Sequence, residues 1–311
     1  MKVAVVIPCH NVEPYVEAAV RSVLAGSHHD LDILAVDDGS TDGTRDVLSR
    51  LQEENPGCFR WTAQENKGAC AARNAGVAAT QGEYVQFLDA DDALFPDKIG
   101  RQLSLASGHD LVIGAYRNVF PDGRPDQDVL PITGDAWEAL VRARLGTTSA
   151  NLFRRDALLR AGGWDERLKS SQDYELMFRM MANGASVAFD PIVGCRILKR
   201  SMGSITRTDE RGNWLRYLEL RRAVRDHLKG TDAAVNAKRI AIAEQNLFVA
   251  VRVLSKHDRE AAFAEYDRTF DAGFVPERSE ANSAAYVAAH RFFGFRMAER
   301  IAGAIAGTRR R

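Results

Sequence analysis

The sequence predicts an α/β fold in which a mostly parallel sheet is flanked by helices and followed by a helical carboxyl-terminal region. Through the first half of the chain, apolar runs rich in β-branched residues alternate with segments of helical spacing. This order is typical of parallel strands joined by crossover helices that cover both faces of a sheet. From Asp209 onward the pattern is helical almost throughout. A chain of 311 residues can hold one large or two ordinary domains, and we expect two, residues 1–208 and 209–311.

The expected strands are short apolar runs bounded by turn-forming residues. The first stops at Pro8, and the fourth runs into the acidic segment that begins at Asp89. The strands are residues 3–7, 31–36, 59–62, 84–88 and 110–115, with shorter candidates at 147–153, 187–189 and 194–197.

The expected helices have apolar residues three and four apart or an Ala-rich composition, and several follow N-cap residues. In the first part of the chain they are residues 13–25, a segment ending near Glu54, 68–80, a segment opened by Pro96, 155–161 and 172–182. Long helices follow around residues 214–228, 233–254, 259–270 and 284–306.

Composition excludes several classes of protein. The 42 basic and 42 acidic side chains cancel, whereas a protein that coats nucleic acid normally has a basic excess. Hydrophobic residues at 45% and charged residues at 27% are ordinary for a globular chain and exclude a disordered one. The four cysteines form no Cys-x-x-Cys pair, which argues against a disulfide scaffold or zinc module and favours a reducing compartment. The apolar run 3–7 is too short for a signal peptide or a membrane helix.

Three acidic groups are candidates for chemistry. Asp37 and Asp38 end the second expected strand, Asp89 and Asp91 follow the fourth, and Asp173 begins a helix. The ligands of open α/β sheets bind beyond the carboxyl ends of the strands. Alternate residues of an extended segment point the same way, so Asp89 and Asp91 together would suit Mg²⁺ or Mn²⁺ held against a diphosphate. Asp-rich turns also follow strands for capping reasons alone, so this spacing by itself is weak evidence.

The motifs are more specific as an ordered set. Segments 5–11, 36–44, 66–76 and 87–92 read VVIPCHN, VDDGSTDGT, NKGACAARNAG and FLDADD, and segments 162–166 and 172–176 read GGWDE and QDYEL. This set resembles the family-2 glycosyltransferases, the large inverting group with the GT-A fold. The resemblance covers about residues 1–205, and the helical region from residue 209 carries no motif of that family.

The resemblance implies a nucleotide-sugar donor, which we expect to be a UDP-sugar, bound by the first domain. Pro8 and its neighbouring backbone would line the pocket for base and ribose, and Asp38 would accept a hydrogen bond from uracil. Asn66 and Arg73 would face the nucleotide, and Asp89 would lie near the ribose. The alternatives are a plain loop role for Asn66 and, for Arg73, a solvated helix charge or a partner for an Asp.

The same resemblance assigns the reaction chemistry. Asp91 would bind the divalent cation, Mn²⁺ or Mg²⁺, that bridges the diphosphate. Asp173 would be the catalytic base that takes the proton of the acceptor hydroxyl, a role that inversion requires of one carboxylate. Many relatives carry Glu-Asp where this chain has Gln172-Asp173, and we interpret Gln172 as a local variant on the acceptor side. The alternative for Asp173 is that it only stabilises a helix N-terminus.

A second departure lies downstream. Relatives often place a His before a Ser-rich turn, where it helps to hold metal or diphosphate, whereas the segment 195–205 of this chain contains none. Lys199 or Arg200 could neutralise phosphate instead, or the segment could be a simple surface loop. Trp164, beside its motif, is a candidate for the acceptor pocket, although a buried core position is the more common fate of a Trp.

The carboxyl-terminal segment is basic and apolar. Residues 291–311 contain six arginines and one acid, and the apolar residues Phe293, Met297, Ile301 and Ile305 follow i, i+4 spacing. A basic amphipathic helix can lie on an anionic membrane surface with its arginine stems snorkelling past the apolar face. The alternative is a helix docked on the protein with a frayed Arg-rich end.

Together these features predict a metal-dependent inverting glycosyltransferase, of hexosyltransferase type, that acts in cell-surface polysaccharide synthesis. Its acceptor would be a hydroxyl of a glycan or of a lipid-linked glycan, and we expect no nucleic-acid partner. We expect a cytoplasmic location, with peripheral contact to the inner face of the membrane as an option. The rival hypotheses are an inactive sugar-nucleotide-binding or scaffold protein of the same fold and, more remotely, a nucleotidyltransferase.

Overall fold

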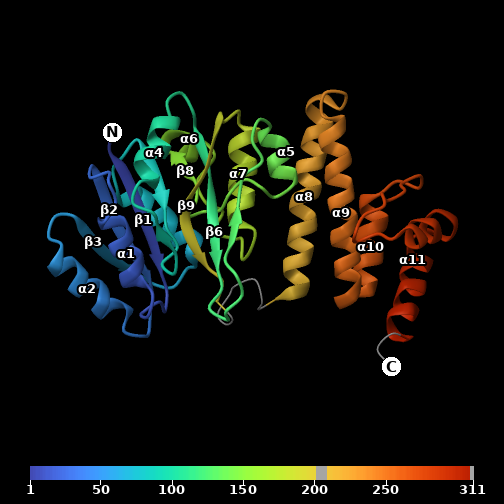
Figure 1. The fold of residues 1–311 in the computed structure, drawn as a ribbon, viewed down its shortest axis with the longest axis horizontal. Coiled ribbons are helices and arrows are strands. Elements are labelled where there is room, and N and C mark those ends of the chain that lie inside the picture. Colours follow the sequence, from blue (N-terminus) through green and yellow to red (C-terminus); the bar gives the residue numbers. More distant parts are fainter. Residues whose placement is uncertain (201–208, 309–311) are drawn as a thin grey trace. The chain divides into compact units, whose positions relative to one another are not determined.

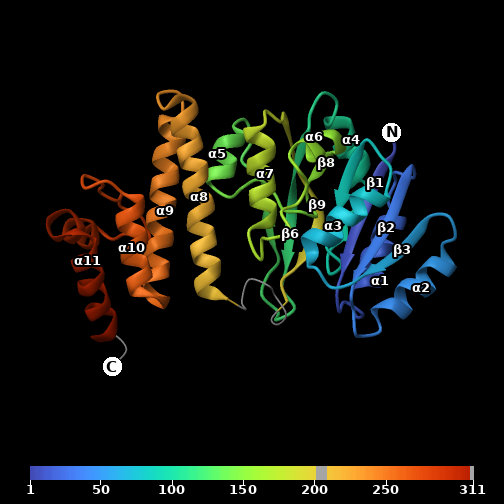
Figure 2. The same cartoon turned by 180° about the vertical axis from the view of Figure 1, so that it is seen from behind.

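The structure is a computed structural model that describes residues 1–200 and 209–308 (Figures 1 and 2). The chain divides into two compact units, Met1–Ser204 and Ile205–Arg311. The domain boundary that we expected near residue 208 lies outside the described residues, and the assignment of separate functions to the two parts stays a prediction.

The first unit is built on one mixed sheet. Its strand order is β3-β2-β1-β4-β8-β6-β9-β5, and β7 pairs with β6. The strands are β1 (Val3–Cys9), β2 (Leu31–Asp38), β3 (Phe59–Gln64), β4 (Tyr84–Phe87), β5 (Ala93–Leu94), β6 (Leu111–Val119), β7 (Gln127–Val129), β8 (Leu152–Arg154) and β9 (Val187–Leu198). Strands β1 to β4 pair in parallel, and so do β6 and β9, which confirms the expected parallel core. Strand β8 is antiparallel to both of its neighbours and joins the two halves.

Helices cover both faces of this sheet (Figures 1 and 2). The helices of this unit are α1 (Val16–Leu24), α2 (Thr44–Glu54), α3 (Ala69–Ala79), α4 (Lys98–Leu105), α5 (Ala136–Val141), α6 (Arg155–Arg160) and α7 (Gln172–Ala182). The apolar stripes of α1 and α2 pack on the face of β1 that carries Val3, Val5 and Ile7. Helix α3 lies on the other face, so close that a Cβ at Gly76 would be 2.2 Å from Cγ1 of Val6. Glycine is therefore required at that position.

Several expected boundaries were wrong for local reasons. Residues 187–189 and 194–197 belong to one strand, β9, whose pairing with β6 is interrupted by shifts of register around Ala115. Of the expected strand 147–153 only residues 152 and 153 are extended, as part of β8 (Leu152–Arg154), because the carbonyl of Thr147 accepts from the backbone N–H of Ala150 and closes a turn. The short elements β5, β7 and α5 were not foreseen, since each is too short to show a period.

A buried polar cluster connects helix α4 with strand β4 of the sheet. Lys98 of α4 is fully buried, and its ammonium group donates to Oε1 of Gln86 and, at 3.2 Å, to the carbonyl of Asn151. Gln86 also donates from Nε2 to the carbonyl of Ser149 at 3.0 Å. Burial disfavours the charged form of the amine and lowers the pKa of Lys98 to about 7.

The second unit is helical, as expected. It contains α8 (Glu210–Asp232), α9 (Ala237–His257), α10 (Arg259–Thr269) and α11 (Ala284–Thr308). Its core is aromatic and is centred on Phe248 of α9. Helix α11 is not continuous, because Gly294 has φ 75° and ψ 172° and breaks the i, i+4 pattern between Phe293 and Met297. No helix in the described ranges 1–200 and 209–308 is long and apolar enough to cross a membrane.

The stability of the first unit should depend on pH through Lys98. Its pKa is about 7 in the folded chain and returns to about 10.5 on unfolding, so between these values the unfolded chain binds the extra proton. Stability from this group therefore rises with pH above about 7, by at most about 1.4 kcal/mol per pH unit, and is constant below. Urea unfolding should show that the free energy of unfolding of the wild type, relative to that of Lys98→Met, is larger at pH 8.5 than at pH 6.5. Parallel pH profiles of the two proteins would contradict this.

Candidate active site

The carboxyl end of β2 is tied to the start of α3 through Asp38. Its carboxylate accepts hydrogen bonds of 2.8 Å from Nε2 of Gln64 and from the backbone N–H groups of Lys67 and Gly68. A carboxylate at a helix N-terminus is stabilised by the unpaired N–H groups there. A carboxylate can accept about four hydrogen bonds, so three protein donors leave Asp38 room for one more.

Arg73 of α3 joins two segments that are far apart in the sequence. Its Nη2 donates to Oδ1 of Asp89 at 2.7 Å, and its Nη1 donates to Oε1 of Gln172 at 3.1 Å. The guanidinium carbon lies 4.5 Å from the ring centre of Trp164, and Nε has no hydrogen-bond partner among the described residues. Arg73 is only 6% exposed, so it is the partner of an Asp rather than a solvated helix charge, and its expected contact with the nucleotide stays a prediction.

Trp164 is held in place by the neighbouring helix α3. Asn74 accepts from the backbone N–H of Trp164 at 2.9 Å and donates to its carbonyl at 2.9 Å. A Cβ at Gly163 would lie 2.9 Å from Oδ1 of Asn74, and the φ of Gly163 is 67°, so both space and conformation require glycine. The Trp164 ring is 2% exposed and packs edge-on against Phe87. Trp164 therefore lies in the core, and its expected contact with the acceptor stays a prediction.

Asp173 lies at the start of α7, next to the Arg73 cluster. The N-cap residue of α7, Ser171, has a left-handed φ of 56°, and Oδ1 of Asp173 accepts from the backbone N–H of Tyr174 at 2.8 Å. Burial raises the pKa of this carboxyl above its ordinary value, while the charge of Arg73 lowers it and that of Asp89 raises it. Asp173 nevertheless remains partly exposed, so a ligand can reach it.

Gln172 uses both ends of its amide within the protein. Oε1 accepts from Arg73, and Nε2 donates to the carbonyl of Leu168 at 2.8 Å. These bonds make Gln172 a residue that fixes the position of Arg73. Its expected role on the acceptor side stays a prediction.

Asp91 pairs with a cation supplied by the chain itself. Nε of Arg200, just after β9, lies 2.8 Å from Oδ2 of Asp91, and the Arg200 guanidinium carbon is 5.2 Å from the ring centre of Tyr15. Burial raises the pKa of Asp91, whereas Arg200 and, more weakly, Lys199 lower it. Arg200 thus pairs with the acidic segment, and its expected contact with phosphate stays a prediction.

The acidic residues fit a divalent cation only in part. No three His, Cys, Asp or Glu side chains within the described ranges converge as a metal site. Mg²⁺ in such sites usually takes one or two carboxylates and completes its shell with substrate phosphates and water. Asp91, with Asp89 near enough to raise its pKa, matches that partial donor set.

Ser149 is a residue of this site that sequence reasoning missed. Its hydroxyl donates to Oδ2 of Asp92 at 2.7 Å and accepts from the backbone N–H of Asp89 at 3.1 Å. Oδ1 of Asp92 accepts from the backbone N–H of Leu198 at 3.1 Å, and burial raises the pKa of Asp92 well above its ordinary value. Ser149 and Asp92 thus hold the acidic loop against β9. Ser149 stands outside any motif, so the sequence carried no signal for it.

The other expected residues lie at the same edge of the sheet. Pro8 is opposite Val36 near the carboxyl end of β1 and is partly exposed. The amide of Asn66 is exposed and lies 3.2 Å from the ring nitrogens of His10, whose Nδ1 is 2.9 Å from the carbonyl of Asp38. The carboxyl ends of β1, β2 and β4 therefore gather the expected nucleotide and metal residues.

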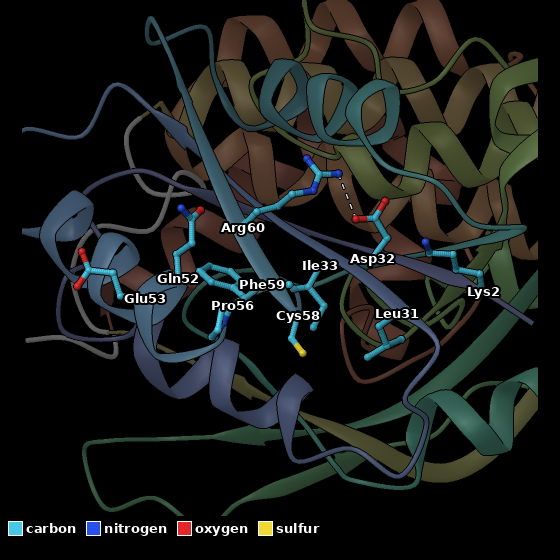
Figure 3. Close-up of a pocket in the computed structure, with 11 residues that line it drawn as sticks. Lys2, Leu31, Asp32, Ile33, Gln52, Glu53, Pro56, Cys58, Phe59 and Arg60 are labelled. Atoms are coloured by element: carbon cyan, nitrogen blue, oxygen red, sulfur yellow. Dashed lines mark hydrogen bonds and ion pairs between the residues drawn. The ribbon is translucent and has the colours of Figure 1, made fainter.

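A cavity of about 540 Å³ lies at the opposite edge, between the amino-terminal ends of β2 and β3 and the end of α2 (Figure 3). The polar groups drawn there are largely engaged with the protein. Arg60 pairs with Asp32 at 3.1 Å, as the dashed line marks, and Gln52 accepts from the backbone N–H of Trp61. Because it lies at the amino-terminal ends of the strands, this cavity is separate from the cluster around Arg73.

Comparison with known proteins places this site in a family. The model of glycosyl transferase family 2 matches residues 4–163, about half of the chain, and includes the first four motifs. The chain belongs to glycosyl transferase family 2. This confirms the resemblance that the motifs indicated.

Relatives and solved structures agree with this family and fold. A glycosyltransferase of Nostoc sp. whose function is uncharacterized is 46% identical over 51% of this chain and 52% of its own length. Chondroitin synthase of Pasteurella multocida is 30% identical over 67% of this chain and 22% of its own length. The matches thus span about half or less of these relatives.

The solved structures show the GT-A fold. S. aureus TarS 1–349 in complex with UDP-GlcNAc has a TM-score of 0.61 at 14% identity, over 90% of this chain and 97% of TarS 1–349. The mannosyltransferase PcManGT from Pyrobaculum calidifontis, in complex with GDP-Man and Mn²⁺, has a TM-score of 0.54 at 20% identity, over 97% of this chain and 86% of PcManGT. At these identities the likeness concerns the fold alone.

Proposed function

We propose that this chain transfers a sugar from a UDP-sugar, with inversion, to a hydroxyl of a glycan or lipid-linked glycan in cell-surface polysaccharide synthesis. The observation that carries the proposal is the double contact of Arg73 with Asp89 and Gln172. It brings the acidic strand end and the start of the helix with Asp173 into one cluster. The UDP-GlcNAc in TarS and the name of chondroitin synthase support the donor and the product class.

The nucleotide would lie along the carboxyl ends of β1 and β2. Pro8 would flank the base, and Asp38 would use its remaining acceptor position for the N–H of uracil. Asn66 is exposed at the mouth of this region, where it can contact the ribose or base. Asp89, already held by Arg73, would accept from a ribose hydroxyl through the oxygen that Arg73 leaves free.

The diphosphate would be neutralised beside Asp91. Asp91 would hold Mn²⁺ or Mg²⁺, and a bound cation would stabilise the negative charge that develops on the leaving diphosphate. Arg200 and the exposed Lys199 would add donors toward the phosphates, in place of the His of relatives. Because Arg200 pairs with Asp91 in this structure, it competes with a cation for that carboxylate.

Asp173 would act as the base. The acceptor oxygen attacks the anomeric carbon from the side opposite to the diphosphate, and its proton passes to the Asp173 carboxylate. The bond from the anomeric carbon to the diphosphate oxygen breaks, and its electron pair leaves with UDP. Burial and the raised pKa make Asp173 a stronger base than an exposed carboxylate.

Replacing the base should abolish turnover and spare binding. Asp173→Asn should lower kcat about 10²- to 10⁴-fold, because the amide cannot take a proton, while UDP affinity by calorimetry stays within about twofold. Asp156→Asn is a matched control, since Asp156 also accepts from the next backbone N–H at 2.8 Å in the first turn of a helix, α6. Full turnover by Asp173→Asn would contradict the assignment of Asp173 as the base. Turnover absent from the wild type as well would favour the inactive binding protein.

Removing Arg200 should change two affinities in opposite directions. Arg200→Gln frees Asp91, so Mn²⁺ alone, followed by electron paramagnetic resonance, should bind severalfold more tightly. UDP with Mn²⁺ should bind about tenfold more weakly, because a donor to the diphosphate is lost. Arg117→Gln is the control, since it breaks an Arg–Asp pair of similar geometry with Asp128 on the β6–β7 hairpin. Equal shifts of both affinities, or none, would contradict the competition.

A further inference from the structure

Helix α11 is divided into two stretches at Gly294, and both contain buried and exposed side chains. The buried side chains are docked on their own unit, where Phe295 and Ala298 join the aromatic core. Glu299 is buried there and accepts from Nε of Arg252 at 2.8 Å and from the hydroxyl of Tyr286 at 2.7 Å. The alternative of a docked helix is therefore right for these side chains.

The exposed side chains of the two stretches include large apolar ones. Phe292 is 77% exposed, Phe293 66%, Met297 43% and Ile301 38%. These four are among only ten large hydrophobic side chains that are exposed in the described part of the chain. Scattered apolar residues are ordinary on a surface, but a concentration within ten residues indicates an interaction site.

The exposed set is also basic. Arg291, Arg296 and Arg300 are exposed and alternate with the apolar residues along the chain. Arg296 reaches Asp267 of α10, and the single acid of the segment, Glu299, is turned into the core. We call these seven exposed residues of the two stretches the α11 patch; they are Arg291, Phe292, Phe293, Arg296, Met297, Arg300 and Ile301.

We propose that the α11 patch binds the surface of an anionic lipid bilayer. Aromatic and aliphatic side chains enter the boundary between headgroups and acyl chains, and arginine guanidinium groups meet the lipid phosphates. The charge pattern argues against a second copy of this chain as the occupant. A twofold interface brings the same patch of both copies together, so it would oppose the positive charge of the patch to an equal positive charge.

Vesicle flotation tests this inference, which does not depend on the proposed sugar transfer. The full chain should float with vesicles of phosphatidylglycerol and phosphatidylcholine at low salt, but not with phosphatidylcholine alone. Binding should fall as salt rises, since the charges are screened. A chain that stays in the soluble fraction with the anionic vesicles, or floats equally with both kinds, would overturn the proposal.

Point variants are preferable to removal of the segment, because truncation after His290 would strip Phe295 and Glu299 from the core. Phe292→Ser with Phe293→Ser, and separately Arg291→Gln with Arg300→Gln, should each lower the lipid partition coefficient at least tenfold while thermal unfolding stays unchanged. Val235→Ser is the matched control, because Val235 is a 73% exposed apolar residue of the same unit outside the patch, and it should bind like the wild type.

Two outcomes of the variant series would overturn the inference. One is that both double variants have the same lipid partition coefficient as the wild type. The other is a dimeric wild type in gel filtration that the Phe292→Ser, Phe293→Ser variant converts to a monomer, which would make the patch an interface between copies.

Discussion

The buried guanidinium of Arg73 is the constraint on which the site depends. It is a planar, permanently charged group whose two terminal nitrogens donate to Asp89 and Gln172, while its carbon lies over the Trp164 ring. A buried charge of this kind is costly unless it is paired, so the surrounding segments must stay in register to satisfy it. The strand end, the loop of Trp164 and the start of α7 are thereby fixed relative to α3.

The other contacts of the site follow from an excess of carboxylates around the Arg73 guanidinium. Asp91, Asp92 and Asp173 all have raised pKa values, because burial penalises their charged forms and because Asp89 lies near each of them. The chain compensates with Arg200 on Asp91 and a Ser149 hydroxyl on Asp92. The metal-bound nucleotide diphosphate that we propose would suit such a site, because it would bring its own cation and exchange partners with Arg200.

The sequence predicted the strand ends well because the signals there are local. Apolar runs, Asp-rich turns and Gly68 before α3 put Asp38, Asp89 and Asp91 at one edge of the sheet. It could not choose the partner of Arg73, since Gln172 lies 99 residues away and the contact depends on tertiary packing. Ser149 gave no signal, and Gly294 was overlooked although a glycine inside a helical pattern weakens it. Strand β8 is too short for the sequence to predict that it runs antiparallel to its neighbours.

The most direct test of this account is the pH dependence of turnover in Arg73→Gln beside the wild type. If Asp173 is the base and Arg73 lowers its pKa, removal of the guanidinium should move the acidic limb of the kcat profile to higher pH, along with a loss of activity near neutrality. A variant with an unchanged acidic limb and undiminished turnover would contradict the claim that Arg73 organises the site and tunes Asp173.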